Sequence, residues 1–285
     1  MSDDRVLLTH DNGAGVRTLT LNRPHRRNAL DDALWRTLRD ALAAAGEDRD
    51  VRALVLTGAG GAFCSGADIS RGLRAEHPTY RMRALSDVAL LLHELPVPTV
   101  AKVTGVAVGA GWNLALGCDL VVATPGARFS QIFARRGLSL DLGGSWLLPR
   151  LVGLQQAKRL TLLAETLDAE QARALNLVTW VVPDAEVDSF TDDVCARLVS
   201  GPPVALAQSK ALLNEGADRT LRDALAGEAR AQAVNFATRD VAEAYAAFAE
   251  RRDPHFTGAW AVPTAAEADT SGVETLSEET VNSDA

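Results

Sequence analysis

The sequence has few cysteines, few aromatic residues and no long apolar run, and each scarcity excludes a class of protein. The three cysteines, Cys64, Cys118 and Cys195, are widely spaced and odd in number, so we expect neither a disulfide framework nor a zinc site. No apolar run approaches the roughly 20 residues that cross a bilayer, and the first residues lack the pattern of a signal peptide. We therefore expect a soluble, cytoplasmic protein with no metal and no membrane partner.

Basic residues are scarce as well. The chain has 29 Lys and Arg against 37 Asp and Glu, for a formal net charge of −8. Six of the acids lie between Thr264 and Ala285, where there is no basic residue. An acidic protein does not attract the phosphates of a nucleic acid, so we expect no nucleic-acid partner. Residues 264–285 are also poor in large apolar side chains, and we expect them to form a disordered tail.

The sequence is rich enough in apolar residues, at 47% of 285, to bury a large core. Up to residue 200, short apolar runs typical of strands alternate with helical spacing, which favours an α/β fold whose helices cover a sheet. Residues 201–263 predict helices alone, as a separate layer at a subunit contact. The predicted strands are Val6–His10, Val16–Leu21, Ala53–Thr57, Thr99–Val103, Leu120–Ala123 and Thr179–Val182. Helices are expected around Leu34 to Ala45 with Asp31 as N-cap, Leu85 to Leu92, Trp112–Gly117, Leu154–Leu163, Ala169–Ala174 with Asp168 as N-cap, Val204–Glu215 and Leu221–Glu250.

Two glycine-rich segments follow predicted strands. In the first, residues 58–66, glycines allow the chain either to present main-chain N–H groups to a ligand or to form a flexible surface turn. In the second, Gly109, Ala110 and Gly111 open a short helix, whose free amides favour an anion. Tight packing of that helix on the sheet explains the second segment equally well. Together, the two clusters of donors suggest an oxyanion hole.

Asp141 is the candidate for proton transfer. It stands between Leu140 and Leu142, and partial removal from water raises the pKa of a carboxyl group, which suits it to act as acid and base. The alternative is that Asp141 caps the helix that begins near Ser145. The local sequence leaves both interpretations open.

Four segments, in order, carry a resemblance to a known family: Asn22–Leu30, Ala62–Ile69, Gly105–Asn113 and Gly137–Ser145. Over about residues 5 to 260 the chain resembles the enoyl-CoA hydratase/isomerase (crotonase) family. The resemblance implies a spiral of repeated ββα units, C-terminal helices used for trimerisation, a homotrimer or hexamer, and an acyl-CoA thioester as substrate. Coenzyme A is then part of the substrate, and no separate cofactor is expected.

By position, the resemblance places the two oxyanion donors on the backbone N–H groups of Ala67 and Ala110. Such donors polarise the thioester carbonyl and stabilise an enolate. Arg26 and Arg27 are candidates for the CoA phosphates, although a solvated basic turn explains them too. Trp112 and Phe133 are expected either to line an acyl pocket or to belong to the core. The complete set of predicted substrate and CoA contacts is Arg26, Arg27, Ser65, Gly66, Asp68, Ile69, Trp112, Asn113, Phe133 and Ser139.

The departures from the family pattern favour one reaction over another. Members that add water use two glutamates, and the matching positions here are Asn113 and Phe133, neither of which transfers a proton as a carboxylate does. Asp141 matches isomerase-type members that use one aspartate, so an enoyl-CoA isomerase is the leading hypothesis. The Ser139-x-Asp141 spacing resembles ring-closing naphthoyl-CoA synthases, a lyase alternative. A hydratase with an atypical mechanism and a non-catalytic acyl-CoA binder are also compatible with the sequence.

Overall fold

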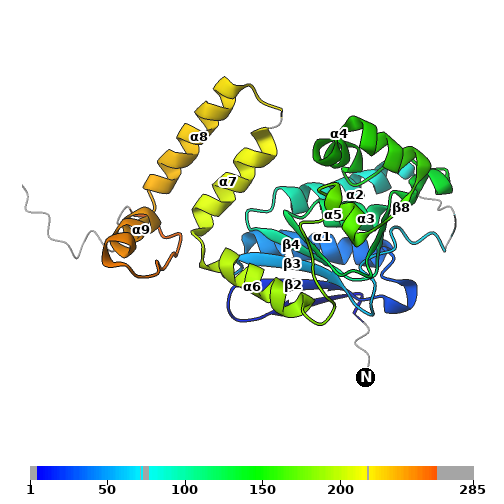
Figure 1. The fold of residues 1–285 in the computed structure, drawn as a ribbon, viewed down its shortest axis with the longest axis horizontal. Coiled ribbons are helices and arrows are strands. Elements are labelled where there is room, and N and C mark those ends of the chain that lie inside the picture. The colour runs from blue at the N-terminus through cyan, green and yellow to red at the C-terminus, as the bar shows by residue number, and fades with distance from the viewer. Residues whose placement is uncertain (1–4, 71, 73–76, 217, 262–285) are drawn as a thin grey trace, which may run out of the picture.

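The computed structural model describes residues 5–70, 72, 77–216 and 218–261, and within them the fold is built around one large and one small sheet (Figure 1). The large sheet has the strand order β1-β2-β3-β4-β6-β9, with β1 and β2 antiparallel and every other neighbouring pair parallel. The small sheet has the order β5-β7-β8. The strands are β1 Leu7–Asp11, β2 Val16–Leu21, β3 Ala53–Gly58, β4 Thr99–Val103, β5 Val106–Val108, β6 Leu120–Ala123, β7 Arg128–Ser130, β8 Thr166–Asp168 and β9 Trp180–Val181.

Helices connect the strands and cover the large sheet. The helices are α1 Asp32–Glu47, α2 Pro78–His93, α3 Ala110–Leu116, α4 Gly144–Leu163, α5 Ala169–Ala174, α6 Val187–Ser200, α7 Pro203–Gly216, α8 Leu221–Phe236 and α9 Arg239–Glu250, with short 3₁₀ turns η1 Pro24–Arg26 and η2 Ile132–Arg136. No helix in the described ranges is both long and apolar enough to cross a membrane.

Strand β3 shows why the sheet needs a cover on each face. Its first five residues are buried, and side chains alternate between faces along a strand. Leu54 and Leu56 belong to the core shared with α1 and α2, whereas Val55 belongs to a second core that includes Val194 of α6. A continuous apolar run is therefore what a parallel strand buried on both faces requires.

Of the last three helices, α7 contacts the rest of the molecule. Figure 1 shows α7 and α8 as an antiparallel pair, with α9 beyond them. Asn214 Nδ2 of α7 donates to His93 O of α2 at 3.0 Å, and Lys210 Nζ of α7 lies 2.8 Å from Asp119 Oδ2. No residue of α7 is buried. Helix α7 therefore links these helices to the rest of the chain, and the separate layer at a subunit contact stays a prediction.

The α/β fold class predicted from the sequence is confirmed, and the six predicted strands lie within two residues of their expected ends. The carboxylates of Asp31 and Asp168 accept hydrogen bonds from Leu34 N and Gln171 N, as expected of N-caps. The single helix expected over Leu221–Glu250 is wrong, since α8 ends and α9 begins around Thr238. The tail predicted over residues 264–285 lies outside the described residues.

Candidate active site

The two glycine-rich segments lie side by side. Cys64 and Ala107 form a parallel bridge, in which Cys64 N donates to Val106 O at 2.9 Å and Val108 N donates to Cys64 O at 3.0 Å. Because the two segments run in the same direction, Ala67 and Ala110 each lie three residues beyond the bridge, at the same end. The structure therefore brings the two predicted oxyanion donors together.

Both of these amides are free to bind a ligand. Neither Ala67 N nor Ala110 N donates a hydrogen bond to any described residue, whereas Asp68 N beside them donates to Leu30 O at 3.0 Å. Gly66 has a φ of +87°, and a Cβ on it would lie 2.9 Å from Val108 O and 3.6 Å from Ala110 N. Glycine at position 66 thus permits both the turn and the close approach of the two loops.

The loop around η1 packs against the first of these segments. Ser65 N donates to Arg27 O at 3.0 Å, and Ser65 Oγ donates to Arg26 O at 3.1 Å. Asn28, which is fully buried, donates from Nδ2 to Ala62 O at 2.7 Å. Both arginines are exposed in the loop that contacts Ser65, and their binding of the CoA phosphates stays a prediction. The anchoring role of Asn28 was not predicted, and its only sequence clue is its place in the first family motif.

Asp68 uses its side chain inside the protein. Its Oδ2 lies 3.0 Å from Arg23 Nη2, and its Oδ1 accepts a hydrogen bond from Ser70 N at 3.0 Å. Hydrogen bonds from Ser70 and then the Arg23 guanidinium lower the pKa of Asp68 to about 2. Asp68 therefore holds the loop in place with its carboxylate, and its role in binding a ligand stays a prediction. The neighbouring Ile69 is 58% exposed.

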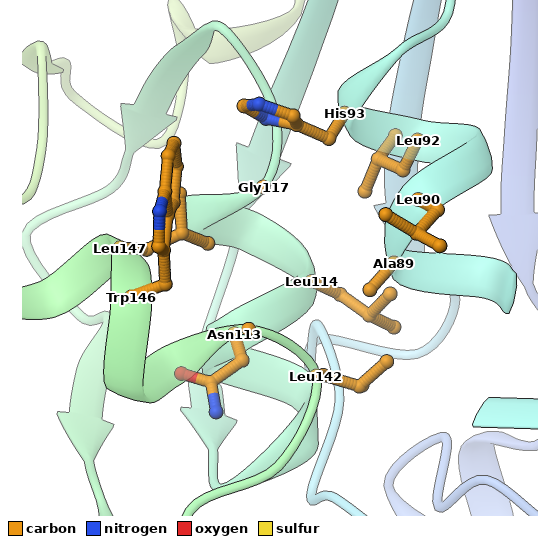
Figure 2. Close-up of a pocket in the computed structure, with 11 residues that line it drawn as sticks. Ala89, Leu90, Leu92, His93, Asn113, Leu114, Gly117, Leu142, Trp146 and Leu147 are labelled. Atoms are coloured by element: carbon orange, nitrogen blue, oxygen red, sulfur yellow. The ribbon is translucent and has the colours of Figure 1, made fainter. Parts of the chain in front are cut away.

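An apolar cavity of about 320 Å³ opens between α2, α3 and the start of α4 (Figure 2). Asn113 and Leu142 lie at one end of it, and His93 lies at the other, with its ring edge-on to Trp146 at 5.2 Å between centroids. Burial lowers the pKa of His93. The cavity is lined by Ala89, Leu90, Leu92, His93, Asn113, Leu114, Gly117, Leu142, Gly143, Trp146 and Leu147.

Asp141 is not among the lining residues, but in the sequence it directly precedes Leu142 and Gly143, which line the cavity. Burial is the main cause that raises the pKa of Asp141 to about 6, and the neighbouring Asn113 amide opposes it. Its Oδ1 is buried and has no hydrogen-bond partner among the described residues. Helix α4 has Gly143 as N-cap and no side-chain cap, so the capping alternative for Asp141 is wrong.

The other predicted residues take different places. Trp112 is fully buried, packs on Phe129 at 5.5 Å between centroids, and belongs to the core rather than to the cavity wall. Phe133 is 5% exposed and lies against Gly109, where an added Cβ would be 3.7 Å from its ring. Ser139 is exposed, and Asn113 is buried and lines the cavity.

The enoyl-CoA hydratase/isomerase family model matches residues 11–259. The chain belongs to the enoyl-CoA hydratase/isomerase family.

Several relatives share most of their length with this chain. It is 41% identical over 249 residues, 86% of this chain and 95% of the relative, to a Rhodobacter capsulatus protein named "Probable enoyl-CoA hydratase". It is 37% identical over 250 residues, with the same two coverages, to a 1,2-epoxyphenylacetyl-CoA isomerase of Escherichia coli. The crystal structure of an enoyl-CoA hydratase from Bacillus anthracis matches with a TM-score of 0.86 at 29% identity, over 89% of this chain and 99% of that one.

Proposed function

We propose that this protein shifts a double bond in an enoyl-CoA thioester, with Asp141 as the acid and base. The Asp141 carboxylate takes a proton from one carbon of the acyl group, and the electrons move onto the thioester oxygen. The amides of Ala67 and Ala110 donate hydrogen bonds to that oxygen. The protonated Asp141 then returns its proton to a different carbon, which restores the carboxylate and completes the shift. No electron is gained or lost overall, so the reaction requires no redox cofactor.

The observation that carries this proposal is the buried Oδ1 of Asp141, which has no hydrogen-bond partner among the described residues, in the residue that directly precedes cavity-lining Leu142. A carboxyl group with a pKa of about 6 is ionised enough to remove a proton near neutral pH and is acidic enough to return it. Asn113 and Phe133 occupy the two positions where a hydrating enzyme of the family needs carboxylates. One acid is sufficient for moving a proton, and adding water by the two-glutamate mechanism is not possible here.

The cavity supports an acyl group as the part of the substrate that enters the protein. Its lining is apolar apart from His93 and Asn113, and the exposed Arg26 and Arg27 lie in the loop against Ser65, where they can meet the phosphates of CoA. A ring-bearing acyl group fits the Trp146 and His93 end of the cavity. The name of the Escherichia coli relative, 1,2-epoxyphenylacetyl-CoA isomerase, agrees with both an isomerisation and such a ring.

Hydration by another mechanism is the second candidate, because relatives from several organisms are named enoyl-CoA hydratases. The ring-closing lyase receives less support, since Ser139 is exposed rather than in the cavity. A non-catalytic acyl-CoA binder would keep its affinity for CoA thioesters and show no turnover.

The deciding experiment replaces Asp141 by asparagine. Asp141→Asn should reduce isomerisation of a panel of unsaturated acyl-CoAs, and deuterium exchange at their α and γ carbons, by about 10²- to 10⁴-fold. Asp188→Asn, which changes an exposed carboxylate that pairs with Lys102 at 2.5 Å, is the matched control and should leave the rate unchanged. Undiminished isomerisation by Asp141→Asn would remove this residue from the mechanism. A wild-type protein that hydrates but neither isomerises nor exchanges would favour the second candidate.

A further inference from the structure

Two buried amide side chains lie directly behind Asp141. Asn113 is 1% exposed and Gln131 is 0% exposed. Asn113 Nδ2 donates to the main-chain oxygen of Asp141 at 2.9 Å, and Gln131 Nε2 donates to Asn113 Oδ1 at 2.9 Å. The two amides thus form a chain of hydrogen bonds that ends on the backbone of the proposed acid.

The direction of this chain is fixed by its last member. A carbonyl oxygen can only accept a hydrogen bond, so Asn113 must turn its NH₂ group toward Asp141. Its oxygen then faces Gln131, which must in turn present its own NH₂ group. A carboxylate at position 113 would place an acceptor against the Asp141 carbonyl, which has no proton to offer. The hydrogen bonding therefore requires an amide at this position.

The turn that Asn113 holds has an unusual backbone. Leu142 and Gly143, which follow Asp141, have φ values of +46° and +75°, and a leucine rarely adopts such a conformation. Two hydrogen bonds converge on the Asp141 carbonyl and hold this turn, one from Asn113 and one from Gly144 N at 2.9 Å. At Gly144 an added Cβ would lie 2.5 Å from Asn113 Nδ2, so only glycine leaves room for this side chain.

We propose that Asn113, supported by Gln131, is a positioning residue that holds the turn after Asp141 in the conformation that leaves Asp141 Oδ1 without a hydrogen-bond partner among the described residues. The proposal rests on the proposed role of Asp141 as acid and base. Asn113 acts through Asp141 and exchanges no proton with the substrate. Position 113, where hydrating relatives use a glutamate, thus serves here to align Asp141.

Three single variants test this role. Asn113→Leu removes both hydrogen bonds and keeps the branched shape of the side chain at a larger volume. Asn113→Asp replaces the donor by an acceptor, and Gln131→Leu removes the support behind Asn113. Each should lower kcat by about 10- to 100-fold, as is usual for residues that orient a reacting group, with KM changed only a few-fold. Because Asn113 and Gln131 act as one unit, the double variant Asn113→Leu/Gln131→Leu should be little worse than Asn113→Leu alone.

A second measurement separates positioning from mere structural support. The carboxyl carbon of Asp141 is titrated by ¹³C NMR in the protein and in Asn113→Leu. Loss of the Asn113 amide, which opposes the effect of burial, should shift the titration of Asp141 to higher pH. No neighbouring charge is among the causes of the Asp141 shift, and His93, on α2 in the same cavity, is the titrating group to follow as an internal reference. A residue with a purely structural role would leave the Asp141 titration in place.

The control for stability is Thr191→Val, which removes a buried hydrogen bond of 2.7 Å within α6, outside the residues that line the cavity. It should lose stability and keep kcat and the Asp141 titration. If Asn113→Leu does not fold, Gln131→Leu carries the same comparison. An inactive wild-type protein would refute the proposed function, and the NMR titration would still test the positioning. This inference would be overturned if the wild type is active and Asp141→Asn is inactive, while Asn113→Leu and Gln131→Leu keep the wild-type kcat and Asp141 titration.

Discussion

At the scale of single residues, Asp141 combines a proposed catalytic use with a loss of stability. Burial raises its pKa from 3.8 to about 6, which means that the folded protein binds this proton more tightly than the unfolded chain does. Between these two pH values the stability falls as the pH rises, and above about pH 6 the loss is complete. Two pKa units correspond to a loss on the order of 2 kcal/mol in a partly buried site.

Asparagine at position 141 removes this loss because it mimics the protonated acid. Asp141→Asn should therefore be more stable than the unchanged protein by on the order of 2 kcal/mol at pH 8, and the difference should shrink toward zero near pH 4. Urea unfolding at several pH values measures it, with Asp188→Asn as the exposed control. A stability difference that does not vary with pH would show that folding does not raise the pKa of Asp141.

The sequence predicts the residue types at the site better than their partners. Asp141 was singled out by its local sequence, the amides of Ala67 and Ala110 were assigned by the family resemblance, and the structure puts both amides at one end of a bridge. The pairing of Asp68 with Arg23 spans 45 positions, and that of Asn113 with Asp141 spans 28. Contacts at such separations depend on how the elements pack, which local patterns do not encode.

At the scale of elements, the contact between the loop at Cys64 and helix α3, which we call the seam, aligns the two proposed oxyanion donors. Gly111 lies in this seam, and a Cβ added there would come within 2.7 Å of Cys64 Cβ and 2.8 Å of its Sγ, besides meeting the Cys64 carbonyl oxygen. Since that carbonyl accepts the hydrogen bond from Val108 N, relief of the clash must separate the loops.

Gly111→Ala should therefore reduce kcat and destabilise the fold, by about 1–3 kcal/mol as for other overpacked sites. Gly126→Ala is the matched control, because the nearest atom to its added Cβ, Thr124 Oγ1, is 4.0 Å away. Steady-state kinetics with an isomerised acyl-CoA and thermal unfolding measure the two effects. If the two alanine variants behave equally, the seam tolerates a wider separation of the loop and helix α3, and it does not set the alignment of the Ala67 and Ala110 amides.

Most elements with strong local patterns were predicted, although helix α6 was missed, and the elements defined by tertiary pairing were not predicted. Strands β5, β7 and β8 each have three residues, too few for alternation to show in the sequence. The break between α8 and α9 contains neither proline nor glycine. It coincides with the antiparallel bridge of Thr238 with Trp260, where Arg239 N donates to Ala259 O at 2.8 Å. Pairing with a distant segment, rather than a local breaker, ends the helix there.

At the scale of the whole molecule, helices α7 to α9 expose more apolar surface than is usual for a monomeric protein. Several large apolar side chains on these helices are open to solvent, and Phe236 and Tyr245 line one shallow groove together. Contiguous apolar surface of this kind marks a site of protein association. The exposed side chains are Leu213 at 79%, Leu221 at 76%, Phe236 at 64%, Tyr245 at 68% and Phe248 at 87%.

We propose that these three helices join copies of this chain into a homotrimer or a hexamer. Sedimentation equilibrium should then give a mass three or six times the 30.2 kDa of one chain. Phe248→Glu should move the distribution to lower mass, because it places a charge in the buried interface, where an unpaired charge is strongly unfavourable. Arg39→Glu, a change of an exposed side chain on α1, should leave the mass unchanged. A monomer at micromolar concentration, or a trimer indifferent to Phe248→Glu, would contradict assembly through this surface.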